Sequence, residues 1–427
     1  MSAIPRRLLP STAVIAALTL VGGCGLAAQN VESGVDAKER GPITYAAGKD
    51  LSGVVPKLIK RWNDTHPGEK ATFIELPENA NSQRQMMIQN AQLKSDTYTV
   101  LSLDAVWTSE FAANRWIDEL PESSFPFDKT LGPINGTVNY RNKWFAMPYA
   151  SDGAMLYYRK DLLEKAGEKP PKTWDEMREV CGKVLEGQSK MSCYGGQFEK
   201  YEGLTVNFSE AVHSAGGKVT DAKGVPHLDT PEAKRGLDNM VKGFRDGMMP
   251  KDAITFMEEP GRRAFEKGKL LFYRQWPYQY AVSNKKSKGN EAAGNFSVAP
   301  IPGENGPGAS SLGGHNLALS SSARNKATAL EFMRFMTNEQ SARMKLNKAS
   351  LAPVFSKLYD DPKLVQKFPY LPVLKKSILG AEPRPRVPRY GDATTAIQDE
   401  VYAALTGKKT SGAALKTLQQ KLQALTP

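Results

Sequence analysis

The sequence predicts an α/β protein that contains a parallel sheet, and two observations carry this prediction. Short apolar runs of strand length alternate with segments of helical periodicity over most of the chain, and the first five of these segments read as β-α-β-α-β. Hydrophobic residues make up 40% of the 427 residues and charged residues 24%, which is typical of a folded globular protein. This length leaves room for two or three domains.

The elements of the first part are separated by turn residues. We expect strands at 43–46, 71–76 and 99–103 and helices at 51–63 and 82–94. His66-Pro67-Gly68 ends the first helix, because proline and glycine rarely continue one. The third strand ends at Asp104. Since a helix follows each of the first two strands, the strands are expected to be parallel, with helices on the faces of the sheet.

Extended segments further along the chain show where it changes domain. Segments 145–149 and 154–158 stand on either side of Ser151-Asp152-Gly153, and we expect the chain to cross between domains there. Further strands are expected at 270–274, 296–301 and 316–319.

Capping residues mark the helix starts of the second part. Thr173 is followed three residues later by Glu176, which is the spacing of a capping box. Pro231 follows Thr230, and proline is favoured at the first helical position. The last part is expected to form a long helix through Met336 and two C-terminal helices.

The first residues have the features of an export signal. Arg6 and Arg7 precede an apolar run at 8–21, which is shorter than the ~20 residues that a membrane-spanning helix needs. Gly22-Gly23-Cys24 follows, and small residues that end on a cysteine resemble the bacterial lipobox, in which the cysteine is acylated. We therefore expect residues 1–23 to be a signal peptide, with lipid on Cys24 holding the chain on the extracellular face of the cell membrane. An ordinary signal peptide with a chance cysteine is the alternative.

The segment after the signal and the overall charge suggest no nucleic-acid partner. Residues 24–40 are small and polar, and we expect a flexible tether. The net charge is +12, but Lys and Arg are mostly interspersed with Asp and Glu. The tight cluster of Lys285, Lys286 and Lys288 lies in a loop rich in Ser, Asn and Gly, and we interpret it as a solvated face.

The three cysteines divide between two expected roles. If Cys24 carries lipid, Cys181 and Cys193 remain, and an even pair in an exported chain indicates a disulfide. Two buried free thiols are the alternative. Neither the spacing nor the neighbours of the pair indicate a metal site.

The sequence shows no familiar catalytic pattern. None of the four histidines pairs with another at a metal-ligand spacing, and the chain has no G-x-S-x-G elbow and no Walker-type glycine loop. Glu258-Glu259 could serve a glycosidase, but adjacent charges of this kind are expected to face solvent. Missing motifs do not by themselves exclude catalysis, since many active sites leave no local pattern. We expect a protein that has neither metal nor cofactor and that is not an enzyme.

Six segments stand out along the chain. They are 104–112 (DAVWTSEFA), 144–149 (WFAMPY), 156–163 (LYYRKDLL), 171–176 (PKTWDE), 298–302 (VAPIP) and 312–318 (LGGHNLA). Each segment is weak alone. In their order and spacing they resemble the family of extracellular solute-binding proteins that serve carbohydrate uptake transporters, which includes maltose- and trehalose/maltose-binding proteins.

The resemblance implies a periplasmic-binding-protein-like fold, with two α/β lobes and a ligand cleft and hinge between them. The first lobe would take 41–150 and 297–349, and the second 151–296 and 350–427. Such proteins close around the ligand by hinge bending, and a transporter recognises the closed shape. The expected ligand is an oligosaccharide, a disaccharide such as trehalose or maltose. The expected partner is the membrane permease of an ABC importer, and the protein is expected to be a monomer.

A sugar site needs hydrogen-bonding side chains around the hydroxyl groups and aromatic rings against the sugar faces. In an open parallel sheet these residues belong beyond the C-terminal ends of the strands. Our candidates are Glu78, Asn79, Asp104, Trp107, Asp152, Trp276, Tyr278, Gly313, Gly314, His315 and Arg384.

The acidic and amide candidates are chosen by their position along the chain. Asp104 ends the third strand and matches a position that similar proteins use to bind a sugar hydroxyl, with a helix N-cap as the alternative. Asp152 lies at the domain crossing, where the trehalose/maltose type supplies a carboxylate, with a turn as the alternative. Glu78 and Asn79 follow the second strand, where a plain loop is equally open.

Aromatic, glycine and cationic residues complete the candidate set, listed here with their alternatives. Trp276 and Tyr278 flank Pro277 and are expected to stack on the ligand, with core packing as the alternative, and Trp107 is expected to face the cleft. Gly313-Gly314 permits a close approach of the backbone to a ligand, and His315 stands where family members often have Trp, which leaves a smaller stacking face. Arg384 lies between prolines, as in trehalose-type members, with a basic surface loop as the alternative.

Two other functions stay open. Binding of another solute, such as a sugar phosphate, a polyamine or a peptide, would keep the fold. A secreted glycoside hydrolase would need two cleft carboxylates about 5–10 Å apart, for which Asp104 and Asp152 are the candidates.

Overall fold

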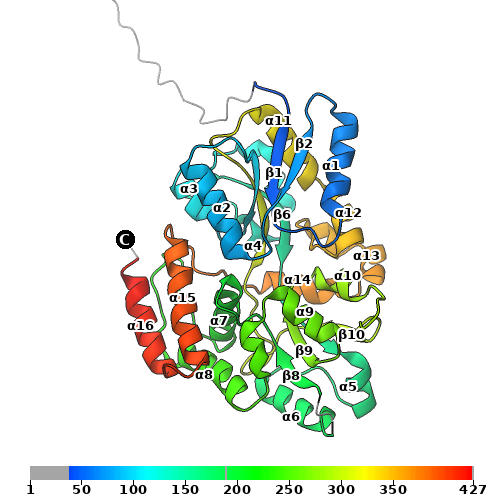
Figure 1. Cartoon of the computed structure of the whole chain (residues 1–427), viewed down its shortest axis with the longest axis vertical. Coiled ribbons are helices and arrows are strands. Elements are labelled where there is room, and N and C mark those ends of the chain that lie inside the picture. Colours follow the sequence, from blue (N-terminus) through cyan, green and yellow to red (C-terminus); the bar gives the residue numbers. More distant parts are fainter. Residues whose placement is uncertain (1–37, 188–189, 426–427) are drawn as a thin grey trace, which may run out of the picture. The chain divides into compact units, whose positions relative to one another are not determined.

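Two separate sheets organise residues 38–187 and 190–425, which this computed structural model describes. Both sheets belong to one compact unit, Gly34–Pro427, and each is the centre of an α/β lobe (Figure 1). The predicted fold class is confirmed. The predicted signal peptide, Cys24 and most of the predicted tether lie outside the described residues.

The first lobe is built on a five-stranded sheet with the order β2-β1-β3-β11-β6. Its strands are β1 (Ile43–Ala47), β2 (Ala71–Glu75), β3 (Val100–Asp104), β6 (Met147–Asp152) and β11 (Gly313–Leu319). β1 runs parallel to β2 and β3, as the β-α-β-α-β pattern predicts, whereas β11 runs antiparallel to β3 and β6. A short hairpin of β4 (Asn139–Tyr140) and β5 (Lys143–Trp144) stands apart from the sheet.

Helices cover both sides of this sheet. They are α1 (Val54–Thr65), α2 (Ala80–Gln92), α3 (Thr108–Ala113), α4 (Gly132–Asn135), α11 (Lys326–Thr337) and α12 (Glu339–Ala349). α2 and α3 lie on the side of β1 opposite α1 (Figure 1). The long helix predicted through Met336 ends at Thr337, because the Asn338 side chain caps a second helix by accepting a hydrogen bond from the Ser341 N–H (2.8 Å).

The start of α1 lies later than the predicted position because Asp50 holds the residues before it in a turn. The Asp50 carboxylate accepts hydrogen bonds from the N–H groups of Ser52 (2.9 Å), Gly53 (3.1 Å) and Val55 (2.8 Å). Gly53 adopts a left-handed conformation with φ of 71°, which glycine adopts at little cost. The chain therefore turns at 50–53 and becomes helical at Val54.

The second lobe is built on a four-stranded sheet with the order β10-β7-β9-β8. Its strands are β7 (Met155–Arg159), β8 (Ser192–Gly195), β9 (Leu270–Gln275) and β10 (Phe296–Ala299). Its helices are α5 (Lys160–Ala166), α6 (Trp174–Val184), α7 (Glu202–Ser214), α8 (Pro231–Arg245), α9 (Glu258–Glu266), α10 (Gln279–Ser283), α15 (Tyr390–Leu405) and α16 (Ser411–Gln423). α13 (Pro362–Lys367) and α14 (Leu371–Leu379) lie between the lobes, where α14 contacts both β6 and β7.

Both predicted helix starts of this lobe are confirmed. The Thr173 hydroxyl accepts from the Glu176 N–H (3.1 Å), and the Thr230 hydroxyl accepts from the Ala233 N–H (3.2 Å). The reciprocal half of the capping box is displaced by one residue, since the Glu176 carboxylate accepts from the Lys172 N–H (2.6 Å).

A disulfide joins α6 to β8. Cys181 and Cys193 are bonded, with 5.5 Å between their Cα atoms and 12 residues of sequence separation. The disulfide reading is therefore confirmed over that of two free thiols. Since α6 packs beside the strand, the bond closes the loop that connects them.

Three connections join the lobes, and they correct the predicted lobe boundaries. The first, between β6 and β7, is at the predicted crossing. The boundary at 297 is wrong, because Ser297 pairs with Tyr158 in the second sheet and the chain returns to the first sheet only at Gly313. The boundary at 350 is also early, since the Leu131 N–H donates to the Val354 carbonyl (3.1 Å) in the first lobe. The sequence does not show which sheet a short strand joins.

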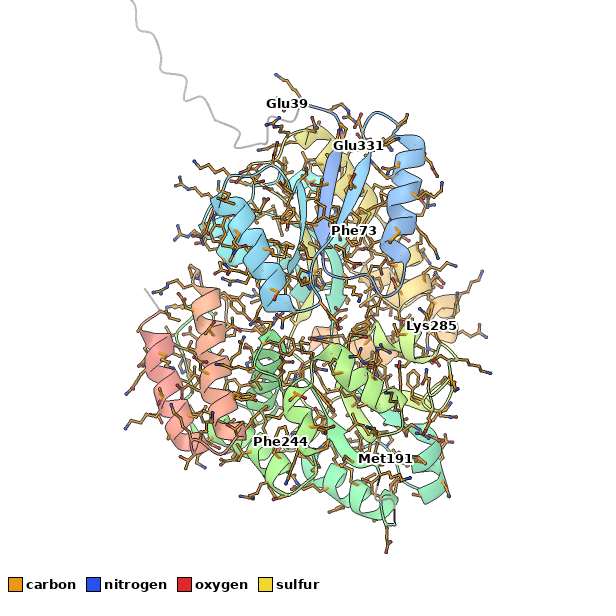
Figure 2. The ribbon with its side chains drawn as sticks, viewed as in Figure 1. Glu39, Phe73, Met191, Phe244, Lys285 and Glu331 are labelled. Carbon is orange, nitrogen blue, oxygen red and sulfur yellow. A yellow bond between two sulfur atoms is a disulfide. The ribbon has the colours of Figure 1, made fainter. Side chains whose placement is uncertain are left out.

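Two smaller predictions concern the start of the folded part and the lysine cluster. The folded part begins slightly before residue 41, because the Glu39 carbonyl accepts from the Ala327 N–H (3.2 Å), and Glu39 and Glu331 lie at the same end of the first lobe (Figure 2). Lys285 points outward, and the three lysines of the cluster are exposed, as predicted (Figure 2). Among the described residues, none of the helices has the length and apolar character needed to cross a membrane.

Candidate ligand-binding site

A cavity of about 280 Å³ lies between the two lobes. Its walls come from the C-terminal ends of β1, β3 and β9, from the N-terminal ends of α7 and α9, and from the crossing segments, as expected for an α/β protein. Its volume lies just below the roughly 300–1,000 Å³ that small-molecule sites span. The sequence candidates that line it are Glu78, Asp104, Trp107, Asp152, Trp276, Tyr278, Gly313, Gly314, His315 and Arg384.

Asn79 is the candidate that does not line the cavity, and its prediction is corrected. Its side-chain oxygen accepts from the Ser82 N–H (3.1 Å) and caps α2. Its amide nitrogen contacts Met257 Sδ of the second lobe at 3.6 Å. The neighbouring Glu78 is exposed and lines the cavity. A residue that follows a strand can equally serve the next helix, and here the two roles fall on adjacent residues.

Asp104 and Arg384 form an ion pair at the base of the cavity. Arg384 Nη2 donates to Asp104 Oδ1 (2.5 Å), and Nη1 donates to Glu202 Oε1 (2.6 Å). Arg384 is 1% exposed at its side chain, so the surface-loop alternative is wrong. Asp104 does not cap α3, whose first residue is Thr108, although its carboxylate accepts from the Val106 N–H (3.1 Å) in the preceding turn.

Asp152 carries a carboxylate oxygen that has no partner in the described protein. The Oδ1 atom is buried and accepts no hydrogen bond. Burial raises the pKa of Asp152 to about 7, the nearby Asp104 adds to the rise, and Arg274 opposes it. A buried acceptor without a partner costs free energy, and it is the kind of group that a ligand hydroxyl satisfies.

Two further side chains on the first-lobe wall have buried polar atoms without a partner in the described residues. They are Trp107 at Nε1 and Tyr149 at its hydroxyl oxygen, and Arg384 adds a third such atom at Nε. All three residues line the cavity. Asp152 lines the same cavity, so all four residues that carry these partnerless atoms surround one small volume.

The aromatic wall comes from the turn after β9. Trp276 and Tyr278 both line the cavity and are partly exposed to it. The Tyr278 hydroxyl donates to Glu259 Oε1 (2.9 Å), which fixes the ring. Neither ring serves core packing alone, because part of each side chain stays accessible in the cavity.

The two glycines serve the protein's own packing. A Cβ on Gly314, whose φ is 114°, would lie 2.2 Å from the Ala150 carbonyl oxygen of the adjoining strand. A Cβ on Gly313 would lie 2.9 Å from carbon atoms of the Trp276 ring. Both residues do line the cavity, but the contacts that require glycine are with the protein itself.

His315 follows the glycines and points into the cavity. It pairs in register with Asp104 on β3, and its side chain remains exposed inside the cavity. Its depth in the molecule lowers the pKa of His315 below its ordinary value of 6.5 because desolvation disfavours the imidazolium; the negative charge of Asp104 opposes this, and that of Arg384 adds to it. The neutral imidazole that this shift favours offers one donor and one acceptor.

Glu258 and Glu259 show where the sequence interpretation is wrong. They were expected to face solvent, but Glu259 is 3% exposed and both residues line the cavity at the N-terminus of α9. The Tyr201 hydroxyl donates to Glu258 (2.6 Å), and Arg262 donates to Glu259 (2.6 Å). The positive end of the helix dipole favours carboxylates there.

Other lining residues had no individual signal in the sequence. Lys49 and Asp50 lie two and three residues after the end of β1, so the strand-end rule that selected Asp104 could have found them. Glu202 begins α7, and Tyr149 lies within β6, where only the folded arrangement places them at the cavity. None of the described residues forms a group of three or more side chains suited to a metal.

Similarity to known proteins identifies the family. Residues 48–343 match the model of the bacterial extracellular solute-binding proteins. The chain belongs to that family. This confirms the resemblance noted in the sequence. It also confirms the expectation that the protein is not an enzyme, because the matched family and the relatives are solute-binding proteins.

Relatives of this solute-binding protein match it over most of their length. A probable ABC transporter-binding protein of Deinococcus radiodurans is 30% identical over 368 residues, 83% of this chain and 86% of that protein. The structure of maltose-bound T. maritima MalE3 is 31% identical, with a TM-score of 0.84, over 90% of this chain and 99% of that one. A mannitol-binding protein of Pseudomonas aeruginosa is 22% identical over 391 residues, 85% of this chain and 88% of that protein.

Proposed function

We propose that this solute-binding protein captures a neutral, hydroxyl-rich ligand, an oligosaccharide of disaccharide size, in the cavity and delivers it to the permease of an ABC importer. The observation that carries the proposal is a set of four buried polar atoms that have no hydrogen-bond partner in the described part of the chain. They belong to residues that line the cavity, Trp107, Tyr149, Asp152 and Arg384. The two lobes close around the ligand, and the permease recognises the closed form.

The chemistry of these atoms suits hydroxyl groups. Trp107 and Arg384 supply N–H donors, Asp152 supplies an acceptor, and the Tyr149 hydroxyl can do either. A hydroxyl both donates and accepts, so one class of ligand can satisfy all four. Trp276 supports this assignment with an aromatic face for the C–H groups of a sugar ring.

The charges around the cavity argue against an anionic ligand. Lys49 and Arg384 are the cationic residues among those that line it, and Arg384 is already paired with two carboxylates. A sugar phosphate would need free cations. The carboxylates that line the cavity are more numerous, but Asp104, Glu202 and Glu259 are paired with arginines, so a polyamine is a weaker candidate than a neutral sugar.

The relatives guide the choice of ligand. MalE3 is a maltose-bound structure at 31% identity, and the Pseudomonas relative binds mannitol at 22% identity. We therefore place maltose first and polyols such as mannitol second. Trehalose stands beside maltose only on the resemblance in the sequence.

Binding can be tested by thermal unfolding of a form without residues 1–24, against maltose, trehalose, glucose, mannitol, a sugar phosphate, spermidine and a peptide. The true ligand is expected to raise the midpoint, because it binds only the folded state. The same mixtures are assayed for released monosaccharide, which a binding protein does not produce. A shift with phosphate, amine or peptide alone would keep the fold and overturn the ligand class.

We further propose that residues 1–23 are a signal peptide, that Cys24 is acylated, and that a tether from residue 24 leads to the folded part, with the protein a monomer on the extracellular face of the membrane. Several acyl chains, as bacterial lipoproteins carry, would make the attachment stable. Cys24→Ser is expected to move the protein from the membrane fraction to the medium and to abolish palmitate labelling. Unchanged membrane attachment would contradict the lipid anchor.

A further inference from the structure

Trp276 is held at its backbone and at its ring edge. Its N–H donates to Gln275 Oε1 (2.9 Å), and its carbonyl accepts from the Tyr157 hydroxyl (3.0 Å). The ring edge lies against Gly313, which has room for it only because glycine has no side chain. The ring therefore has little freedom to translate within the cavity.

Arg274 covers one face of this ring. Its Cζ lies 3.8 Å from the centroid of the Trp276 ring, a distance possible only above a face, because the ring atoms block an approach in the plane. Guanidinium groups stack favourably on indole. Arg274 is 1% exposed and is not among the residues that line the cavity. A ligand in the cavity can therefore stack only on the opposite face.

The guanidinium of Arg274 is itself fixed. Its Nε and Nη2 donate to the two oxygens of Glu210 (2.8 and 2.5 Å), and its Nη1 donates to Gln197 Oε1 (3.1 Å). The two-pronged pair sets the plane of the guanidinium as well as its position. A lysine could not reproduce both this pair and the stacking.

Glu210 connects the stack to a crossing segment. Its Oε1 also accepts from the Ser311 N–H (3.0 Å), two residues before Gly313. The contacts thus form a closed circuit through Ser311, Glu210, Arg274, Trp276 and Gly313. Loss of the arginine breaks this circuit next to the ring.

We propose that Arg274 is a positioning residue for ligand binding: pinned by Glu210, it fixes the plane of the Trp276 indole and leaves one face for the ligand. This inference rests on the proposed function, in which Trp276 is the stacking surface. Arg274 acts through Trp276 and does not touch the ligand. Its charge has a second and separable effect, since it lowers the pKa of Asp152 against the effects of burial and Asp104.

The test is a double-mutant cycle measured by titration calorimetry on the mature chain. Arg274→Met/Glu210→Gln removes both charges, so no unpaired charge remains buried. We expect the carbohydrate that stabilises the wild type to bind about tenfold more weakly. In a Trp276→Ala background the same two substitutions are expected to change affinity less than about twofold, because their effect passes through the ring. Equal losses in both backgrounds, or no loss in either, would overturn the proposal.

A matched control comes from the neighbouring strand β7. Arg159 is also buried and makes a two-pronged pair with Asp161 (2.9 and 2.7 Å), but neither residue lines the cavity. Arg159→Met/Asp161→Asn is expected to leave affinity unchanged. A similar loss in this variant would show that removal of any buried charge pair in the lobe weakens binding, and the proposal would fail.

A ligand-free measurement separates this inference from the proposed function. If none of the carbohydrates binds, the proposed function fails, but the ring can still be followed by acrylamide quenching of Trp276 fluorescence, taken as the difference between each protein and its Trp276→Phe variant. Quenching is expected to rise in Arg274→Met/Glu210→Gln, since a methionine does not hold the plane of the indole and the freed ring exposes more of its surface to the cavity. Unchanged quenching would overturn the positioning role whatever the ligand.

Discussion

Arg384 and Asp104 are 280 residues apart in the chain and form an ion pair between the lobes, with 2.5 Å from Nη2 to Oδ1. The same guanidinium reaches Glu202 at the start of α7, so one cation compensates a carboxylate from each lobe. The Glu202 carboxylate also accepts from the Thr394 hydroxyl (2.8 Å) and from the Tyr390 hydroxyl. One side chain from the third connection therefore neutralises carboxylate charge in both lobes.

Arg384→Met is expected to lower the free energy of unfolding by about 3–5 kcal/mol, because it leaves the buried Glu202 and the partly buried Asp104 without a cation. Denaturant unfolding at pH 7 measures the change. Arg386→Met is the control, since Arg386 is exposed and lies two residues further along the same segment; a change below about 0.5 kcal/mol is expected there. Equal losses in the two variants would show that the segment, not the ion pair, matters.

Asp152→Asn is expected to remove a pH dependence of stability. Burial and Asp104 raise the pKa of Asp152 from 3.8 to about 7, so the folded state holds its proton in the range where the unfolded chain has lost it. Stability of the wild type is therefore lost as pH rises through this range. The free energy of unfolding of the variant therefore rises relative to that of the wild type as the pH increases from 3.8 to about 7. Above pH 7 the difference stays constant, at up to about 4 kcal/mol. Unfolding curves at several pH values test this; a pH-independent difference would contradict it.

Removal of the disulfide is expected to weaken the fold without changing the site. Cys181→Ser/Cys193→Ser opens a loop between residues 12 positions apart, which costs about 3 kcal/mol on the chain-entropy model. Neither cysteine lines the cavity, so ligand affinity is expected to stay the same. Unfolding in the presence and absence of a reductant checks the first part, and calorimetry checks the second.

Gly314→Ala is expected to lower stability by about 2–4 kcal/mol, because the new Cβ meets the Ala150 carbonyl oxygen and the backbone is left-handed. Gly412→Ala is the control. Gly412 lies in α16 with open space around it, and alanine there is expected to be neutral or stabilising by up to about 1 kcal/mol. If both variants behaved alike, the close strand approach would have no energetic effect.

Local sequence rules predicted the part of the site that depends on strand ends. Asp104, Asp152 and Trp276 all follow or end strands, and parallel α/β topology brings such positions to one edge. The capping residues Thr173 and Thr230 could also be located from the sequence, because a cap and its partner lie within three residues of each other.

The rest depends on contacts that are distant in sequence. The role of Arg384 is set by Asp104 and Glu202, which are far from it along the chain. Glu258 and Glu259 look like a solvated pair until α9 points its N-terminus at the cavity. The wrong lobe boundary at 297 has the same origin, because the sequence of a four-residue strand does not show which sheet the strand joins.

The partnerless atoms at the cavity predict that binding and stability respond differently to the same substitution. Trp107 and Trp62 are each 1% exposed, but Trp62 Nε1 donates to the Glu69 carbonyl (2.8 Å), whereas Trp107 Nε1 has no partner in the described protein. Trp107→Phe is therefore expected to change the free energy of unfolding by less than about 1 kcal/mol, since relief of the buried N–H offsets lost packing, while affinity falls several-fold. Trp62→Phe is expected to cost about 1–3 kcal/mol and to leave affinity unchanged. Denaturant unfolding and calorimetry on both variants decide this, and a larger stability loss in Trp107→Phe than in Trp62→Phe would show that the Trp107 N–H is satisfied within the free protein.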